Sequence, residues 1–362
     1  MTFHKIFLSL FITSSILFLS SFNWVEKNDS DPFYFPPLVG NEWETKSMES
    51  LGWNQQALQP LKSYLKNKNT KSFMILVNGK IVLEEYFDGH NASSIWQWNS
   101  AGKTLTSATI GIAQQEGKLN INNKVSDYLG KGWTREPLEK ENLITVKNLL
   151  TMTSGINDSR QIIAKFTLKH KADAGTRWSY HNVFQKLMDI VKKSTSSADY
   201  DAYFNAKLKN KIGMDGYWKN KLMFSIYHSS ARSMARFGLL ALNKGKWNNE
   251  QIVDEQYFNE SISSSQSINP AYGYLWWLNG KKNYMVPSGQ KVYSGSLIPN
   301  APSDMYAAMG YADQRLYVIP SKNMVIVRMG KASNPVNHNF AVSGFDNELW
   351  AKINALIEIK PF

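Results

Sequence analysis

A serine and a lysine three residues apart are the first side chains in this sequence that could do chemistry together. Ser100 and Lys103 have this spacing, which on a helix puts both on one face with Cβ atoms about 5 to 6 Å apart. A neutral lysine at that distance can accept the serine proton and turn the hydroxyl into a nucleophile. The same spacing recurs at Ser63 with Lys66 and at Ser288 with Lys291, so the surroundings must decide between the pairs.

The surroundings favour the pair at Ser100. A run with helical period follows it and ends at Gly117, so Ser100 lies at a helix N-terminus, where free backbone amides favour an oxyanion. Trp96, Trp98 and the apolar helix face would desolvate Lys103 and lower its pKa. The alternative is that Ser100 only caps the helix.

The other two pairs lack such surroundings. Ser63 falls on the solvent side of an expected amphipathic helix, and Ser288 falls in a connection rich in glycine and lysine. Neither place would desolvate the lysine.

A second group follows at Tyr180-His181-Asn182, directly before an apolar helical run. A tyrosine beside a lysine can have a lowered pKa and pass a proton between the serine and a leaving group. The alternative is a core aromatic whose hydroxyl is hydrogen-bonded.

Composition excludes several other chemistries. The 362 residues include no cysteine, which removes disulfides, thiolate metal sites and cysteine nucleophiles. The six histidines show no ligand spacing, so we expect no metal and no organic cofactor. The net charge of +12 is scattered without a basic run, which argues against a nucleic-acid partner. Weak binding of an anionic polymer remains an alternative, and it would be sensitive to salt.

The elements that must position these residues follow from the hydrophobic period. Leucines indicate a helix from Leu51 to Leu65, and a second helix is expected from Asp346, as N-cap, to Ile357. Strands are expected near both chain ends, and Asn78-Gly79 predicts a type I′ turn between the first two. The expected strands are Ser72 to Val77, Lys80 to Phe87, Met305 to Met309, Arg315 to Ile319 and Met324 to Met329.

Between these strands, the apolar residues recur mostly at the spacing of a helix. We therefore expect an α/β (α+β) fold in which one antiparallel sheet is built from both chain ends and flanked by helices. Residues 48–99 and 265–362 form the sheet part, and residues 100–264 form an inserted, mostly helical part.

The N-terminus has the pattern of a secretory signal. Residues 1–21 combine His4 and Lys5 with an apolar stretch from Ile6 to Leu19, which is shorter than the roughly 20 residues that a membrane span needs. Residues 22–47 are polar and contain three prolines, which predicts an extended arm. We expect an exported, periplasmic or secreted protein; the alternative is an uncleaved segment that anchors it to a membrane.

From about Leu51 onward, the chain resembles the superfamily of serine β-lactamases, penicillin-binding proteins and related esterases. Ser100-Ala101-Gly102-Lys103 and Tyr180-His181-Asn182 match two of its motifs. The segments from Ile144 to Gly155 and from Ser230 to Gly238 resemble family segments near these motifs. The chain is most similar to class C-like members, among them esterases and amidases that cut 6-aminohexanoate oligomers.

The resemblance implies a β-lactamase/DD-peptidase-like fold and a role for each matched residue. Ser100 would be the nucleophile, Lys103 its base or proton relay, and Tyr180 the acid or base toward the leaving group. Asn182 would position the substrate or the lysine.

The third family motif departs from its usual form. Ala308-Met309-Gly310 stands where relatives have Lys-Thr-Gly or His-x-Gly, so only Gly310 is retained. The lysine of that motif helps to hold a substrate carboxylate, and its absence favours neutral esters or amides over β-lactams. By the same alignment, the backbone amides of Ser100 and Tyr311 form the oxyanion hole, and Asp313 stands where relatives often have glycine.

The sequence therefore predicts a serine hydrolase that cleaves a small ester, amide or peptide through an acyl-serine. The alternatives are a β-lactamase or D-Ala-D-Ala peptidase, and a non-catalytic module of the same fold that binds cell wall or peptide. Five tryptophans are candidates to line an acyl pocket, although core positions suit most of them better: Trp96, Trp98, Trp178, Trp276 and Trp277.

Overall fold

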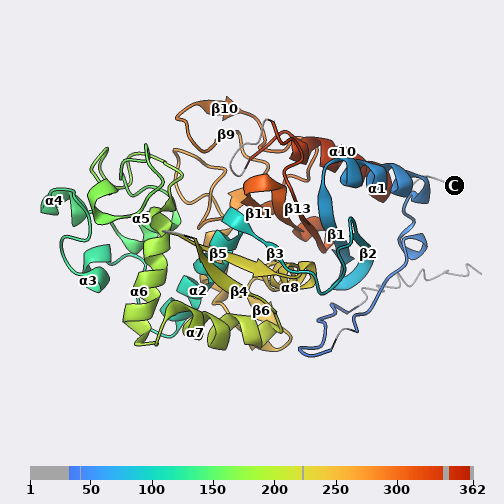
Figure 1. The fold of residues 1–362 in the computed structure, drawn as a ribbon, viewed down its shortest axis with the longest axis horizontal. Coiled ribbons are helices and arrows are strands. Elements are labelled where there is room, and N and C mark those ends of the chain that lie inside the picture. Colours follow the sequence, from blue (N-terminus) through green and yellow to red (C-terminus); the bar gives the residue numbers. More distant parts are fainter. Residues whose placement is uncertain (1–31, 41, 222–223, 337–341, 359–362) are drawn as a thin grey trace, which may run out of the picture. The chain divides into compact units, whose positions relative to one another are not determined.

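The computed structural model describes residues 32–40, 42–221, 224–336 and 342–358. The segment expected to be a signal peptide lies outside these residues. Residues 33–362 form one unit, which contains all the elements discussed below. Figure 1 shows these elements in sequence colours.

An antiparallel sheet combines strands from the two ends of this unit, as predicted (Figure 1). Its strand order is β2-β1-β13-β12-β11-β8, so the early strands β1 and β2 lie beside the late strand β13. The strands are β1 (Thr70–Val77), β2 (Lys80–Tyr86), β8 (Trp277–Leu278), β11 (Tyr306–Gly310), β12 (Gln314–Ile319) and β13 (Met324–Gly330).

The turns between paired strands follow the local sequence. Asn78 and Gly79 both have positive φ, 51° and 85°, which is the conformation that a type I′ turn requires. After β12, Pro320–Lys322 forms a single 3₁₀ turn that ends at Asn323 with φ 44°. The first hairpin therefore forms where Asn78-Gly79 predicts it.

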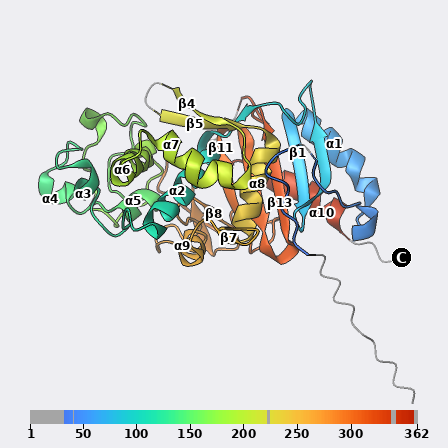
Figure 2. The ribbon, with the colours of Figure 1, turned by 90° about the horizontal axis from the view of Figure 1, so that it is seen from below.

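Helices cover both faces of this sheet (Figure 2). Leu316 lies within reach of Gly238 on α8 (Ala231–Leu242), whereas the next residue, Tyr317, packs against Trp350 of α10 (Phe345–Ile357). Successive residues of a strand point to opposite faces, so α8 and α10 lie on opposite sides. Helix α1 (Leu58–Asn67) contacts both α10 and β1.

Two helix starts differ from the prediction. The first helix begins at Leu58, and two short 3₁₀ turns, Glu49–Leu51 and Gln55–Ala57, occupy the residues before it. The last helix is capped by Gly344, and Asp346 is not its N-cap. The Asp346 carboxylate instead accepts hydrogen bonds from Arg315, because a buried guanidinium binds it more strongly than backbone amides do.

The inserted part is mostly helical, but it also contains a hairpin that the period did not predict. Strands β4 (Tyr217–Lys221) and β5 (Phe224–Ser229) pair with each other, and β5 also pairs with β3 (Trp96–Gln97). The remaining short strands are β6 (Lys246–Trp247), β7 (Glu250–Gln251), β9 (Asn283–Met285) and β10 (Val292–Ser294). Besides α8, the α-helices of residues 100–264 are α2 (Lys103–Gln115), α3 (Val125–Leu129), α4 (Leu138–Glu141), α5 (Val146–Leu150), α6 (Lys186–Thr195), α7 (Tyr200–Phe204) and α9 (Glu255–Ser261).

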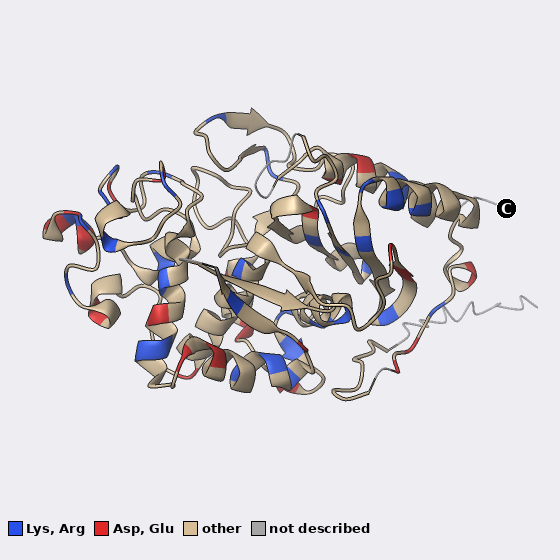
Figure 3. Cartoon of the chain, in the orientation of Figure 1, with Lys and Arg blue, Asp and Glu red and all other residues tan. Residues whose placement is uncertain are grey.

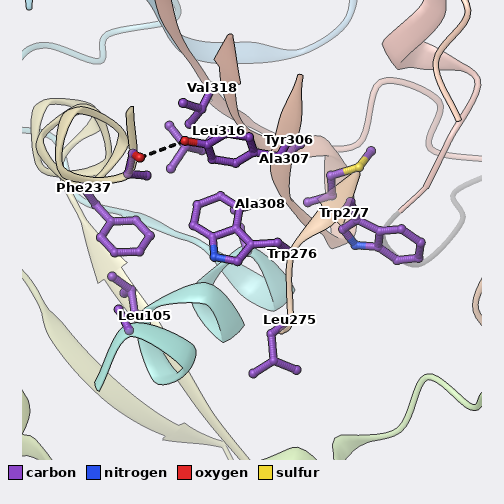
Figure 4. Packing of buried hydrophobic residues seen from close by; sticks show 14 of the residues in the cluster. Leu105, Phe237, Leu275, Trp276, Trp277, Tyr306, Ala307, Ala308, Leu316 and Val318 are labelled. Atoms are coloured by element: carbon purple, nitrogen blue, oxygen red, sulfur yellow. Dashed lines mark hydrogen bonds between the residues drawn. The ribbon is translucent and has the colours of Figure 1, made fainter. Parts of the chain in front are cut away.

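A continuous hydrophobic core joins the inserted part to the sheet (Figure 4). Trp276 packs against Phe237 of α8 and edge-on against Tyr306 of β11, whose hydroxyl donates to the Ala241 carbonyl at 2.8 Å. Ala308, at the first position of the altered third motif, is fully buried in this core. The sheet and the helical part are therefore packed as one body around the third-motif strand.

Of the expected arm, residues 32–40 and 42–47 are described, and their backbone is hydrogen-bonded to other parts of the unit. The amide of Tyr34 donates to the carbonyl of Asn78 at 2.9 Å. The buried guanidinium of Arg236 donates to the carbonyls of Pro36 and Pro37. The arm is thereby tied to the hairpin turn and to α8.

Candidate active site

Ser100 lies in a 3₁₀ turn, Asn99–Gly102, between strand β3 and helix α2. Asn99 has φ 49°, a left-handed conformation that asparagine tolerates better than most residues. The Ser100 Oγ lies 2.7 Å from Lys103 Nζ. The N-cap of α2 is Gly102 without a side-chain bond, so Ser100 does not serve as the cap of that helix.

Lys103 is buried, with 4% of its surface exposed. Its ammonium group lies 4.7 Å from the ring centre of Tyr180 and 4.5 Å from that of Phe184. No carboxylate forms an ion pair with it in the part of the chain that the structure describes. Burial therefore lowers the pKa of Lys103 to about 7, so a large share of this side chain is neutral near pH 7.

Tyr180 lies beside both Lys103 and Ser100 and is nearly buried. The expectation of a lowered pKa is wrong, because burial raises the pKa of Tyr180 more than the neighbouring Ser100 hydroxyl lowers it. The phenol is therefore protonated near neutral pH, and it can donate a proton rather than accept one.

The other two serine–lysine pairs lack this environment. Ser63 and Lys66 are exposed on α1. Ser288 has φ 67° in the non-helical connection between β9 and β10, and Lys291 is exposed and lies against Tyr293. Neither lysine is desolvated, as the sequence indicated.

Asn182 lies beside Tyr180, but the described contacts do not connect it with Lys103. Its amide nitrogen donates to the Gln161 carbonyl at 3.2 Å, and its backbone amide donates to the Gln161 side chain. His181 is buried, and its Nε2 lies 2.8 Å from the Arg160 carbonyl. The loop around Gln161 thus holds the second motif in place, and the Asn182 side chain faces the pocket described below.

Gly310 at the end of β11 lies directly against the nucleophile turn. A Cβ at this position would come within 2.3 Å of the Trp98 carbonyl oxygen and 3.0 Å of the Ala101 nitrogen. The next residue, Tyr311, accepts a hydrogen bond on its carbonyl from the Asn99 side chain at 2.8 Å. This close approach explains why the third motif keeps its glycine although its lysine is missing.

The two residues after Tyr311 have left-handed conformations, with φ 60° at Ala312 and 58° at Asp313. Each costs roughly 1–2 kcal/mol for a residue with a Cβ. The left-handed φ at Asp313 is one that glycine adopts without this cost. Here the Asp313 carboxylate is held instead by Arg315 at 3.0 Å and by Ser343 at 2.6 Å.

These elements surround a pocket of about 410 Å³. Ser100, Lys103, Tyr180, Asn182 and Tyr311 all line it, so the structure brings together the two motifs and the residue after Gly310. Lys103 is the one lining residue with a charged side chain among those described. The other lining residues are Gln97, Asn99, Gly102, Gln161, Phe184, Gln185, Met188, Trp218, Phe224, Ser225, Ile226, Pro287 and Ser288.

Trp98 does not line the pocket, contrary to the sequence interpretation. It is fully buried, and its indole donates to Ser229 Oγ at 2.7 Å. Trp178, Trp276 and Trp277 also belong to the core, and Trp96 donates to the Gly330 carbonyl outside the pocket. The alternative that these tryptophans pack in the protein body is therefore correct for all but Trp96, which is half-buried.

The apolar wall of the pocket comes from residues that the sequence did not single out. Phe184 and Met188 follow the second motif at helical spacing, and this period could have marked them. Trp218 and Phe224 come from the hairpin β4–β5, and nothing in their local sequence indicates that they reach Ser100.

The described residues contain neither a membrane-spanning helix nor a cluster of metal ligands. Among them, no helix is long and apolar enough to cross a membrane. No group of three or more histidine or acidic side chains in the same residues could hold a metal ion.

Comparison with known proteins places this fold in a family. The model of the beta-lactamase family matches residues 69–341. An uncharacterized protein of Alkalihalophilus pseudofirmus is 24% identical over 295 residues, which cover 71% of this chain and 82% of that protein.

Solved structures agree on the fold. A Bacillus anthracis protein provisionally named 6-aminohexanoate-dimer hydrolase has a TM-score of 0.65 at 18% identity. The match covers 89% of this chain and 88% of the Bacillus anthracis chain. A family VIII carboxylesterase has a TM-score of 0.65 at 13% identity, and the match covers 87% of this chain and 99% of the esterase chain. A penicillin-binding protein from Bacillus halodurans has a TM-score of 0.58 at 15% identity, and the match covers 82% of this chain and 99% of the penicillin-binding protein chain. With a family match over most of its length, this chain belongs to the beta-lactamase family of hydrolases.

Proposed function

We propose that this protein is a serine esterase or amidase that cleaves its substrate through an acyl-Ser100 intermediate. The observation that carries the proposal is the buried, unpaired Lys103 with its Nζ 2.7 Å from the Ser100 Oγ, at the wall of a pocket. A desolvated lysine is a base near neutral pH, and a serine beside it is a nucleophile.

The reaction follows from the protonation states. Neutral Lys103 takes the Ser100 proton while Oγ forms a bond to the substrate carbonyl carbon, whose oxygen becomes an oxyanion. The backbone amides of Ser100 and Tyr311 stabilise that oxyanion. The bond to the leaving group then breaks, and this group receives a proton from Tyr180, which regains one from protonated Lys103. Water repeats the sequence on the acyl-serine and releases the acid.

The pocket supports a neutral substrate. Its wall combines apolar side chains with carboxamides, and the Lys103 ammonium group is already hydrogen-bonded to Ser100. No described lining residue besides Lys103 offers a cation to a substrate carboxylate. We therefore propose uncharged esters or amides as substrates in preference to penicillins or D-alanyl peptides, which present a carboxylate.

A fluorophosphonate probe tests the nucleophile. Wild-type protein should be labelled on Ser100, and Ser100→Ala should abolish the labelling. Ser63→Ala is the matched control, because it removes the serine of the exposed serine–lysine pair on α1. Labelling that persists in Ser100→Ala would mean that another residue is the nucleophile. A wild-type protein that is not labelled would support the non-catalytic module instead.

A comparison of substrates tests the preference. Short p-nitrophenyl esters should be hydrolysed, whereas nitrocefin should be turned over slowly or not at all. Fast nitrocefin turnover would show that the protein is a β-lactamase in spite of its altered third motif.

Export is a separate proposal that rests on the first 21 residues. Cell fractionation with intact-mass measurement should find a protein shortened by about that segment outside the cytoplasm. A full-length mass in the membrane fraction would indicate an anchor, and a full-length mass in the cytosol would contradict export.

A further inference from the structure

Side chains donate hydrogen bonds to all four carbonyls of the turn Gly310–Asp313. Arg315 Nη1 donates to the Gly310 carbonyl at 2.9 Å, and Asn99 donates to that of Tyr311 at 2.8 Å. Arg328 Nη1 donates to the carbonyls of Ala312 and Asp313 at 2.9 and 3.0 Å. Both arginines are fully buried.

The bond from Arg315 acts on one particular peptide unit. The carbonyl of Gly310 and the N–H of Tyr311 belong to the same planar peptide group, in which they point in opposite directions. A guanidinium that holds the carbonyl therefore fixes the direction of the N–H. It also polarises the peptide, which makes the N–H a stronger donor.

Arg315 is itself held rigidly. Its Nε and Nη2 donate to the two oxygens of Asp346, at 2.5 and 2.9 Å, and Nη2 also donates to Asp313 at 3.0 Å. The Asp313 carboxylate accepts further bonds from Ser343 and from the Ser333 amide. Coulomb attraction by Arg315 and these hydrogen bonds outweigh burial and lower the pKa of Asp313 to about 2.

We propose that Arg315, held by Asp313 and Asp346, is a positioning residue that orients and polarises the Gly310–Tyr311 peptide for stabilisation of the oxyanion. The inference rests on the proposed function, since it assumes that the Tyr311 amide faces the reacting carbonyl. It adds that a buried guanidinium outside the pocket sets the strength of that donor. The left-handed turn is kept because it brings this peptide group between Arg315 and the nucleophile turn.

Two variants and one matched control test the proposal with p-nitrophenyl acetate. Arg315→Lys keeps the charge but loses the planar fork that reaches both Asp346 and Gly310. Asp313→Asn removes one carboxylate that holds Arg315 but leaves the pair of Arg315 with Asp346 intact. Asparagine also tolerates the left-handed φ of this position. Tyr317→Phe removes a hydroxyl that bonds Asp346 in the same cluster but does not touch the turn.

We expect both test variants to lower kcat by roughly 10- to 100-fold, because displacing an oxyanion donor costs up to about that factor. KM should stay within about two-fold, and the pH at which activity rises should not move. The affinity for phenylboronic acid, whose tetrahedral serine adduct occupies the oxyanion site, should fall by the same factor as kcat. Tyr317→Phe should lower the melting temperature without lowering kcat.

Several results would overturn the proposal. Folded variants with wild-type kcat and boronate affinity would do so, as would an equal loss of kcat in Tyr317→Phe. Failure of both test variants to fold would assign the cluster a purely structural role. If wild-type protein is not labelled on Ser100, the proposed function itself has failed, and this outcome is distinct from labelled wild type with unaffected variants.

Discussion

At the scale of single residues, the pKa of Lys103 sets how activity depends on pH. In the proposed mechanism Lys103 acts as a base when neutral, and burial places its pKa at about 7. We therefore expect kcat/KM to rise tenfold per pH unit below about pH 7 and to level off above it. Because burial raises the pKa of Tyr180, the plateau should extend to at least about pH 9.

A pH series with a p-nitrophenyl ester, corrected for spontaneous hydrolysis, measures this profile. Lys103→Met should lose nearly all activity at every pH. A profile that instead falls through pH 7 would mean that the protonated lysine is the active form.

The same lysine lowers the stability of the folded protein. Its folded pKa of about 7 lies below the usual value of 10.5, so the folded state binds fewer protons than the unfolded chain between these values. Stability should then increase as pH rises through this window. Lys103→Met should raise the free energy of unfolding at pH 7 by roughly 2 to 4 kcal/mol, at about 1.4 kcal/mol per pKa unit.

Urea unfolding at pH 7 and pH 10 measures this effect, and Lys66→Met is the control because Lys66 is exposed. A less stable Lys103→Met protein would show that packing of the lysine stem matters more than its charge.

The sequence predicted the residues of the motifs better than the other residues that line the pocket. Ser100 and Lys103 lie together because the spacing of one motif places both side chains, whereas the resemblance of the second motif to the family placed Tyr180 beside them. Trp98 was misplaced, since an indole beside a nucleophile can point into the core as easily as into a pocket. Trp218 was missed because it reaches the site from a hairpin more than 100 residues further along the chain.

At the scale of elements, the contact between β11 and the nucleophile turn depends on Gly310. A Cβ there would meet backbone atoms of Trp98 and Ala101, which cannot swing away as a side chain could. Gly310→Ala should therefore push the strand from the turn and lower kcat by roughly 100-fold. It should also lower stability by about 1–3 kcal/mol through overpacking.

Steady-state kinetics and thermal unfolding measure these two effects. Gly344→Ala is the control, since a Cβ there meets nothing within 4 Å and its φ is −66°. Its stability should change by less than about 0.5 kcal/mol. Wild-type kcat in Gly310→Ala would mean that the turn and β11 can separate without harm to the site.

Which elements the sequence predicts depends on how much of each is buried. Strands β1, β12 and β13 are buried along nearly their whole length and each contains a run of apolar residues, so this run and the adjoining turns predicted them. The hairpin β4–β5 was missed because Tyr217, Lys219 and Asn220 are exposed, which leaves β4 without an alternating apolar face.

At the scale of the whole molecule, the net charge of +12 does not concentrate on one element. Figure 3 shows lysines and arginines interspersed with acidic residues over the described elements. The described elements therefore carry no basic stripe of the kind by which nucleic-acid-binding proteins are recognised.

The buried charges that matter for the whole molecule join α10 to the sheet through Asp346, Arg315 and Asp313. The folded pKa of Asp313, about 2, lies below its value of about 3.9 in an unfolded chain. Such a carboxylate stabilises the fold above the unfolded pKa, and this stabilisation is lost as pH falls through the folded pKa. Asp313 should thus contribute about 2 kcal/mol at neutral pH, which disappears between about pH 4 and pH 2.

Urea unfolding of wild type and Asp313→Asn at pH 7, 4 and 2.5 isolates this contribution. Wild type should be more stable by about 2 kcal/mol at pH 7, and the difference should shrink toward pH 2.5 because protonated aspartate resembles asparagine. Tyr317→Phe should instead show a difference from wild type that changes little with pH, because it removes a neutral hydroxyl from the same cluster. If the difference in stability between wild type and Asp313→Asn does not change with pH, the packing of Asp313, and not its charge, holds α10 and the turn Gly310–Asp313 against the sheet.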